Sequence, residues 1–187
     1  PWKDASAREY GLKIGVNTAG VDRRFSGKGY SLSPASIRSI SAGERLILPS
    51  PNGSAISFRA RDKGIAVFSG CFRNLVATAE ACGHYKRILL IPCGERWPDG
   101  SLRPSVEDYV AAGGIISALG REQTSPEAQA AAVAYQHYRK QGPALLQACA
   151  SAAELRQRGF EEDVALCLEL DAGKHACRLH GDFYTAA

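Results

Sequence analysis

The sequence predicts an α/β protein with a three-layer α/β/α architecture and a mostly parallel sheet. Short apolar runs recur along the chain, near-continuous rather than alternating, as expected for strands covered on both faces. Helix-like segments stand between these runs, and strands joined by crossover helices form parallel sheets with right-handed connections. The 187 residues, 45% of them hydrophobic and 22% charged, are enough for one globular domain with a substantial core.

Residues 11–120 are expected to contain three of the apolar strands and four of the helices. Residues 11–32 are glycine-rich and predict weak strands and loops. A short helix is expected to begin at Ser33-Pro34, because Ser as N-cap followed by Pro at the first helical position is a favoured start. The apolar runs predict strands at 45–50, 65–70 and 87–92, and the segments between and after them predict helices at 54–63, 74–83 and 105–120.

The second half predicts further helices and two final strands. Residues 125–158 are rich in Ala, Gln, Glu and Arg and predict one or two helices, interrupted near Gly142-Pro143. Residues 164–170 and 175–180 predict strands. With no repeat and no linker, we expect a single α/β domain over residues 1–187. Because the chain begins with Pro1 and contains no Met, we expect either that an N-terminal segment is missing or that residues in a modified form are absent from the printed sequence.

Composition excludes several classes of function. The formal net charge is +4, and the 23 Lys and Arg residues are scattered rather than gathered on one face, which argues against nucleic-acid binding. No apolar run approaches the roughly 18 residues that a membrane span needs. The first residues do not resemble a secretory signal. We therefore expect a cytoplasmic protein without membrane or nucleic-acid partners.

The six cysteines predict reduced, mostly buried thiols rather than a disulfide framework. Cys71, Cys82 and Cys93 recur at an interval that matches no zinc site. On a strand, His175 and Cys177 share one face while His180 points to the other, so these three side chains are not expected to bind one ion.

Four junctions where a strand or loop meets a helix are candidate anion-binding sites. A helix N-terminus presents unpaired backbone N–H groups and about half a positive charge, so phosphate binds there without a special side chain. The alternative is that Ser33, Asn52, Asn74 and Ser105 are N-caps alone. Ser105 also resembles the start of a capping box, with Asp108 three residues later. The junctions are Ser33-Pro34, Ser50–Ser54, Cys71–Asn74 and Cys93–Ser105.

The loop after the 87–92 run concentrates charged side chains of both signs. In a parallel α/β sheet, ligands bind beyond the carboxyl ends of the strands, where such loops meet. An anionic substrate and a cation together would require both signs of charge. The charged residues of the loop and of the helix start that follows it are Glu95, Arg96, Arg103, Glu107 and Asp108.

Known phosphate chemistries can be tested by their spacing. Gly27-Lys28 fails the P-loop pattern, which needs Gly five residues before Gly27 and Ser or Thr after Lys28. Cys93 lacks the Arg six residues later that a cysteine-dependent phosphatase requires, and we interpret it as a packing residue. A metal-assisted transfer remains, in which a carboxylate-held Mg²⁺ and arginines neutralise the phosphoryl oxygens.

The order of these motifs resembles the 2-phosphosulfolactate phosphatase family over about residues 30–182. Members begin with a strand bearing an Asp and an Arg that has no counterpart here, and the family's Asn-Gly-Thr turn is Asn52-Gly53-Ser54 in this chain. The matching motifs are Ser33-Pro34, Ser50-Pro51-Asn52-Gly53-Ser54, Arg73-Asn74, Pro92–Arg96, Ser105–Gly113 and Gly159–Val164.

The resemblance implies an Mg²⁺-dependent α/β/α enzyme that removes phosphate from 2-phospho-3-sulfolactate on the route to coenzyme M, and it suggests a homodimer. Three arginines around the pocket would share the substrate's negative charge, and Glu95 is the favoured metal ligand. The expected catalytic residues are Arg96, Glu95 and Arg73; the expected substrate-binding residues are Asn52, Gly53, Ser54, Asn74, Cys93, Gly94, Arg103 and Ser33; the candidate metal ligands are Glu95, Glu107 and Asp108.

Two other classes of function remain open. The first is a non-catalytic module that binds phosphorylated anionic metabolites and releases no phosphate. The second is a structural or interaction protein whose loop charges serve solubility. Loss of phosphate release in a folded variant would distinguish the enzyme from both.

Overall fold

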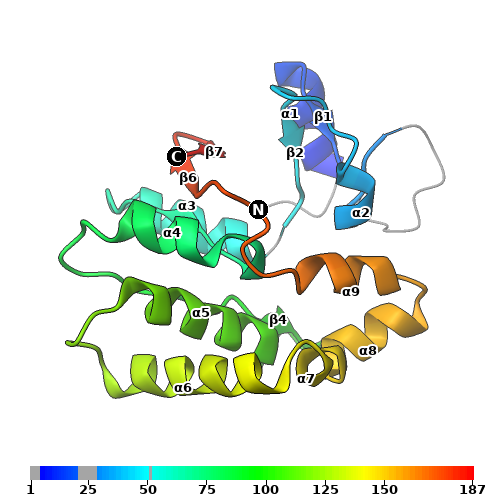
Figure 1. Cartoon of the computed structure of the whole chain (residues 1–187). Helices are drawn as coiled ribbons and strands as arrows, with labels where there is room; N and C mark the ends of the chain where they lie inside the picture. The colour runs from blue at the N-terminus through cyan, green and yellow to red at the C-terminus, as the bar shows by residue number, and fades with distance from the viewer. Residues whose placement is uncertain (1–4, 21–28, 51) are drawn as a thin grey trace. The chain divides into compact units, whose positions relative to one another are not determined.

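The computed structural model describes residues 5–20, 29–50 and 52–187, and shows a mixed α/β chain with more helix than strand (Figure 1). The P-loop test at Gly27-Lys28 and part of the predicted 11–32 segment lie outside the described residues, as does Pro51. The chain divides into two compact units, Pro1–Ile56 and Ser57–Ala187. None of the helices in the described ranges has the length and hydrophobicity to cross a bilayer.

The first unit is small and contains the one parallel strand pair that the described chain shows. Strand β1 (Asn17–Thr18) pairs with β2 (Leu46–Ile47). Helix α1 (Ala5–Ile14) precedes β1, so the prediction of strand and loop is wrong for residues 11–14. Helix α2 (Pro34–Ile37) begins at the predicted proline, and α3 (Gly53–Arg61) starts in this unit and continues into the second.

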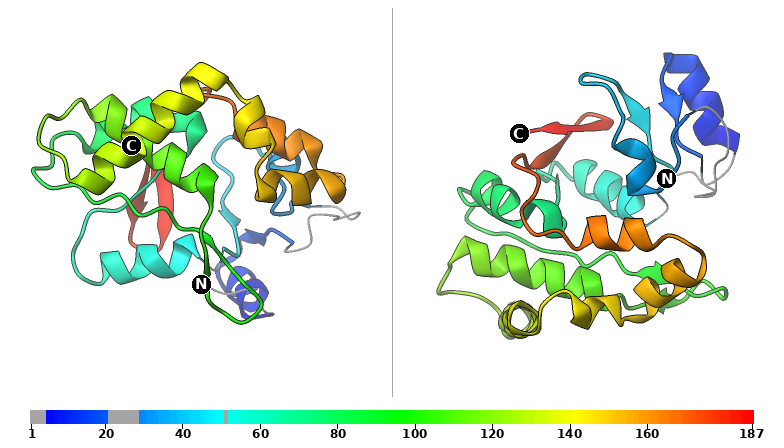
Figure 2. Two further views of the ribbon diagram at one scale, coloured as in Figure 1. Left: turned by 90° about the horizontal axis from the view of Figure 1, so that it is seen from below. Right: turned by 45° about the vertical axis from the view of Figure 1, so that its right-hand side comes forward.

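The second unit is built mainly from helices. Helix α5 lies between α4 and α6, as Figures 1 and 2 both show. Its helices are the 3-10 turn η1 (Phe72–Asn74), α4 (Leu75–Cys82), α5 (Val106–Leu119), α6 (Pro126–Gln141), α7 (Ala144–Gln147), α8 (Ala150–Gln157) and α9 (Glu161–Cys167), and its strands are β3 (Phe68–Ser69), β4 (Glu95–Arg96), β5 (Leu102–Arg103), β6 (Cys177–His180) and β7 (Phe183–Ala186).

The core of the second unit contains apolar side chains from η1 and from helices α4 to α9. Leu75 and Tyr138 are each 1% exposed. The Phe72 ring packs at 5.3 Å from that of Tyr138. Burial of one such side chain contributes about 1.5–3 kcal/mol. This packing holds η1, and therefore the Cys71–Asn74 junction, against α5 and α6. The buried cluster is Phe72, Leu75, Ala79, Val110, Ala111, Ile115, Tyr138, Leu146, Ala152, Val164 and Leu168.

The prediction of a mostly parallel three-layer sheet is wrong. The described strands form small sheets: β3, β6 and β7 are antiparallel in the order β3-β6-β7, and β4 pairs antiparallel with β5. The 87–92 run belongs to no strand of the described chain. It has no regular secondary structure; Leu90 packs against the core, whereas Leu89 is 82% exposed and Ile91 48% exposed.

The predicted strand at 164–170 is also wrong, because residues 164–167 lie in helix α9 (Glu161–Cys167) and residues 168–170 belong to no strand. Glu161, Glu162 and Asp163 fill its first turn, where carboxylates interact favourably with the helix dipole. Val164 and Leu168, four residues apart, are both buried, as one face of a helix requires. A short apolar run cannot be assigned to strand or helix from periodicity alone.

Several predicted elements are confirmed with shifted ends. The helices predicted at 54–63, 74–83 and 105–120 are α3, α4 and α5. The 125–158 region is interrupted near Gly142-Pro143 as predicted, but it contains the three helices α6, α7 and α8 rather than one or two. Gly142 ends α6 with φ of +79°, a value that favours glycine. The strand predicted at 175–180 is β6, which begins at Cys177.

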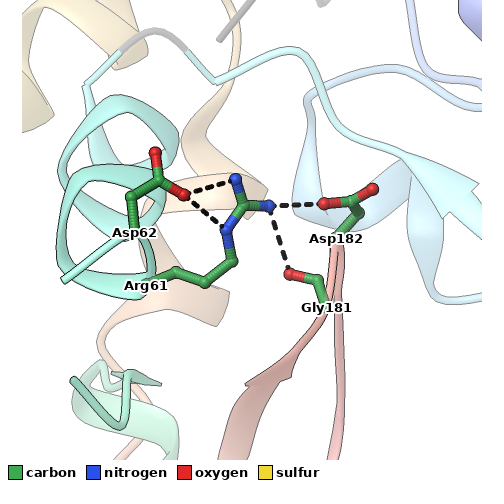
Figure 3. A network of polar contacts seen from close by, with 4 residues as sticks. All are labelled: Arg61, Asp62, Gly181 and Asp182. Carbon is green, nitrogen blue, oxygen red and sulfur yellow. Dashed lines mark hydrogen bonds and ion pairs between the residues drawn. The ribbon is translucent and has the colours of Figure 1, made fainter. Parts of the chain in front are cut away.

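An exposed polar network joins the last turn of α3 to the β6–β7 turn (Figure 3). The Arg61 guanidinium donates to the Asp62 carboxylate at 2.7 and 3.0 Å, to the Gly181 carbonyl at 3.3 Å and to the Asp182 carboxylate. Figures 1 and 2 show the hairpin beside α3. Ser57 on α3 also shares a hydrogen bond of 2.7 Å with the Tyr184 hydroxyl of β7. These contacts fix the orientation of the hairpin.

We expect Gly113→Ala to destabilise the second unit. A Cβ at Gly113 would lie 1.9 Å from the backbone oxygen of Ala131, so α5 and α6 would have to separate. We expect a loss of about 2 kcal/mol in the free energy of unfolding, after allowing for the better helix propensity of Ala. Gly114→Ala is the matched control, since its Cβ would meet side-chain atoms of Leu75 and Tyr135 that can rotate. Urea denaturation curves with equal losses in both variants would contradict this.

Candidate functional site

The charged loop after Cys93 is tied to the start of α5 by one hydrogen bond. Asp108 Oδ2 accepts from the Gly94 backbone N–H at 2.7 Å. Gly94 has φ of +64°, and a Cβ there would lie 3.0 Å from the Arg103 carbonyl oxygen. Within the described ranges Ser105 makes no side-chain cap bond, so the capping box predicted for Ser105 and Asp108 is wrong. The Asp108 carboxylate holds the loop instead.

Asp108 lies in an unfavourable electrostatic environment for a carboxylate. Burial raises the pKa of Asp108, and the charges of Glu107 and Glu95 raise it further, while the Gly94 N–H partly opposes them. Glu95 belongs to β4 and Glu107 to the first turn of α5. Glu107 and Glu95 therefore lie close enough to Asp108 to repel its carboxylate, and a cation beside Asp108 would relieve that repulsion.

These carboxylates do not form a complete metal site. Among the described residues, no group of three or more His, Cys, Asp or Glu side chains is placed to hold a metal ion. Mg²⁺ in phosphate-transfer sites is usually bound by one or two carboxylates, with water and substrate oxygens completing the shell. The carboxylate oxygens of Asp108 and Glu95 are suited to supply one or two ligands of this kind. The described residues do not supply a complete set of protein ligands for the ion.

Arg96 is the predicted arginine whose charge is least neutralised. It lies on the exposed β4–β5 hairpin, where it pairs with Leu102. Its Nη1 donates to the Gly100 carbonyl at 2.7 Å. Within the described residues its guanidinium has no carboxylate partner. It can therefore approach an anionic group from solution at little cost.

Arg103 is held in a structural ion pair. Its guanidinium donates to both Glu154 oxygens, at 2.7 and 3.1 Å, and lies 4.9 Å from the centre of the Trp97 ring. The side chain is 15% exposed. Sequence reasoning missed Glu154 and Trp97, and a partner 51 residues away leaves no local signal. The contacts attach the β4–β5 hairpin to helix α8.

The Arg103–Glu154 pair predicts a pH-dependent contribution to stability. The hydrogen bonds from Arg103 lower the pKa of Glu154. The stabilisation is therefore present above the unfolded pKa of Glu154 and is lost as the pH falls through the lower folded value. In a double-mutant cycle with Arg103→Ala and Glu154→Gln, we expect the coupling measured by urea denaturation to decline below the usual Glu range and in high salt. A coupling energy that changes with neither pH nor salt concentration would contradict this prediction.

Arg73 and Asn74 are both engaged with the fold. Arg73 Nη1 donates to the Leu166 carbonyl at 3.0 Å and to the Glu169 carboxylate. Asn74 is 7% exposed; its Oδ1 accepts from the Cys71 N–H, and its Nδ2 donates to the carbonyls of Ser69 in β3 and of His175 in the segment before β6. Their roles in catalysis and substrate binding stay predictions.

Cys93 has the properties of a packing residue. It is half-buried, and its Sγ lies 3.7 Å from the Ile91 carbonyl. Burial and the nearby Asp108 carboxylate raise the pKa of the Cys93 thiol. Because the thiolate is the nucleophilic form, this environment disfavours nucleophilic attack by Cys93.

The remaining predicted residues belong to the first unit. Ser33 is buried, and its backbone N–H donates to Ser31 Oγ at 3.1 Å. The Ser54 hydroxyl donates to the Ser50 carbonyl, and Asn52 and Gly53 stand at the start of α3. Convergence of these residues with those of the second unit stays a prediction.

A surface groove on α5 and α6 is distinct from the charged loop. It is lined by apolar and polar side chains, among them Ile116, Val133 and Gln136, and by none of the predicted site residues. Arg121 at its edge donates to the Gly83, Tyr85 and Lys86 carbonyls, so its charge serves the fold.

Comparison with known proteins assigns the chain to a family. The model of the 2-phosphosulpholactate phosphatase family matches residues 23–181. A protein of Thermotoga petrophila called "Probable 2-phosphosulfolactate phosphatase" is 29% identical over 165 residues, which are 87% of this chain and 70% of that protein. The protein of the same name from Thermotoga maritima is 28% identical over the same shares. The chain belongs to the 2-phosphosulpholactate phosphatase family.

Proposed function

We propose that this protein is a phosphoric monoester hydrolase acting on a small anionic 2-hydroxy acid, with 2-phospho-3-sulfolactate as substrate and 3-sulfolactate and phosphate as products. The observation that carries the proposal is the family match over residues 23–181, which includes the whole charged loop and the start of α5. The identity of 29% supports the reaction class more directly than the substrate.

The charge of such a substrate explains why arginines are needed. Phosphate, sulfonate and carboxylate on one three-carbon frame bring about four negative charges at neutral pH, more than one helix terminus can balance. Arg96 can hold an oxyanion through two parallel N–H bonds. Arg73 and Arg103 would have to exchange a carboxylate partner for the substrate, so Arg96 is the first contact in this proposal.

The proposed chemistry is in-line attack on phosphorus by water or by a carboxylate of the chain. Arg96 stabilises the equatorial oxygens as their charge redistributes, and the Gly94–Asp108 hydrogen bond keeps the loop in position. Glu95 and Asp108 would hold Mg²⁺, with Glu107 as the alternative ligand. Bound Mg²⁺ would supply neutralisation of the phosphoryl charge.

The wider expectations belong to the same proposal. They are a place on the route to coenzyme M, a homodimer and a cytoplasmic location. Size-exclusion chromatography with light scattering would test the homodimer independently of activity.

A phosphate-release assay tests the proposal. We expect release from 2-phospho-3-sulfolactate with Mg²⁺ and loss of release with a chelator, restored by excess Mg²⁺. A non-catalytic binding module would instead bind the ester, detectable by calorimetry, with no phosphate released. Turnover that persists with all divalent cations removed would contradict the metal-assisted mechanism.

A further inference from the structure

Two cysteines lie on the same face of the β3–β6 ladder. Ser69, the last residue of β3, is paired with Cys177, the first residue of β6. Cys71 follows two residues after Ser69, and side chains two apart on an extended chain share a face. Cys71 and Cys177 are therefore diagonal neighbours across the two chain segments.

The Asn74 side chain holds the two segments together beyond the last strand pair. Its Oδ1 accepts from the Cys71 backbone N–H at 2.8 Å, and its Nδ2 donates to the Ser69 and His175 carbonyls at 3.4 and 3.3 Å. One amide group thus bridges the segment that carries Cys71 and the segment that leads into Cys177. Asn74 is buried, so the hydrogen bonds of its side-chain amide are shielded from solvent.

The two thiols differ in accessibility, as a sensing pair requires. Cys71 is exposed, whereas Cys177 is half-buried. Of the six cysteines only Cys82 is fully buried, so the prediction of mostly buried thiols is wrong. Burial and the charge of the adjacent Cys71 raise the pKa of Cys177, which makes Cys177 the less reactive thiol of the two toward peroxide. The contribution from Cys71 ends once Cys71 is oxidised to an uncharged sulfenic acid, and Cys177 then needs only the short-range attack on its neighbour. Cys71 is thus the thiol that an oxidant in solution meets first, with Cys177 beside it as the resolving partner.

We propose that Cys71 and Cys177 form a site of reversible oxidation, in which a peroxide oxidises the two thiols to a disulfide. The Cys71 sulfur attacks hydrogen peroxide, which leaves a sulfenic acid and one water. The Cys177 sulfur then attacks the sulfenic sulfur, the S–S bond forms and a second water leaves. Two thiols lose two electrons and two protons, and the O–O bond of the peroxide is reduced to two waters.

The geometry indicates a labile disulfide. Diagonal neighbours in an antiparallel ladder have Cα atoms about 7–8 Å apart, whereas disulfides span about 4.4–6.8 Å. The bond therefore requires a small movement of Cys71, which lies beyond the end of β3 and follows Gly70. Strained or exposed disulfides are the more easily reduced ones, so we expect dithiothreitol to reverse the modification.

The test treats the whole chain with a modest excess of hydrogen peroxide, blocks the remaining thiols and maps the peptides. We expect a mass about 2 Da lower, since two hydrogens are lost, and a Cys71–Cys177 peptide that disappears with dithiothreitol. Cys71→Ser and Cys177→Ser should each abolish this peptide. Cys82→Ser, at a buried thiol, is the matched control and should retain it.

Three outcomes would overturn the proposal. They are six intact thiols after treatment, a disulfide that maps to another pair such as Cys93–Cys177, and irreversible sulfinic acid at Cys71. The mapping on the unsubstituted chain stands even if a serine variant folds poorly. None of these results depends on phosphate release, so this experiment tests the thiol pair independently of the proposed function.

Discussion

Arg96→Ala is expected to lower kcat/KM for phosphate release by about 10²–10³-fold, the cost of removing one donor from a developing oxyanion. Arg96 lies on the exposed β4–β5 hairpin and bonds the Gly100 carbonyl without a carboxylate partner among the described residues. Its loss should therefore remove substrate charge stabilisation while leaving the core intact. Initial rates over a range of substrate concentrations would separate kcat from KM.

The conservative variant distinguishes charge from geometry at this position. Arg96→Lys keeps the positive charge but loses the planar fork that binds an oxyanion through two hydrogen bonds. We expect it to recover part of the activity and to respond more strongly to salt. A simple loss of hairpin structure would not be relieved in this way.

Arg87→Ala is the matched control for Arg96→Ala. Arg87 is an exposed arginine in the irregular 87–92 run before the loop, outside the proposed site. We expect its substitution to change neither the rate nor the thermal midpoint. If Arg96→Ala were as active as Arg87→Ala, Arg96 would not contact the substrate in the transition state.

Local signals in the sequence were sufficient for most helices. Ser33-Pro34 and Ser125-Pro126 begin helices because proline fixes φ near its helical value and needs no N–H partner there. Gly142 ends α6 because it adopts positive φ. These effects act within one turn, so one stretch of sequence contains all the information.

The sheets could not be predicted in the same way. The 87–92 run is as apolar as a buried strand, yet Leu89 and Ile91 are exposed and belong to no described strand. The 164–170 run is apolar because α9 buries Val164 and Leu168 on one face. In both runs the outcome depends on which distant segments pack against them, and periodicity over six residues does not encode this.

The site shows the same division between local and distant information. The charged loop and the helix start were recognisable because Glu95, Arg96 and Asp108 are close in sequence. The partners that neutralise Arg73 and Arg103 were not, since Glu169 and Glu154 lie 96 and 51 residues away. The sequence thus identified the charged residues, and the structure showed that Arg73 and Arg103 are paired with distant carboxylates.

Asp108→Asn is expected to raise the thermal midpoint at pH 7 while lowering kcat by about 10–100-fold, the range for residues that support a metal or its ligands. The activity falls because Asn lacks the negative charge that Mg²⁺ would need. Stability rises because the Asn oxygen can still accept from the Gly94 N–H, without the cost of a buried charge beside Glu107 and Glu95.

The raised pKa of Asp108 determines how the stability difference between Asp108→Asn and the native chain changes with pH. Because burial raises the folded pKa of Asp108 above its unfolded value, protonation favours the folded state. The contribution of this carboxyl is fully present below the unfolded pKa and is lost as the pH rises through the folded pKa. The stability advantage of Asp108→Asn should therefore shrink toward zero in acid, where the native carboxyl is already neutral. Thermal melts from acid to neutral pH would measure it.

Glu161→Gln separates this effect from a general loss of negative charge. Glu161 is an exposed first-turn carboxylate of α9, so its removal should slightly weaken the helix and leave phosphate release unchanged. Mg²⁺ should raise the thermal midpoint of the native chain more than that of Asp108→Asn, because a ligand stabilises only the state that binds it. If Asp108→Asn instead lowered the midpoint at pH 7 and kept full activity, Asp108 would be a purely structural tether for the Gly94 loop.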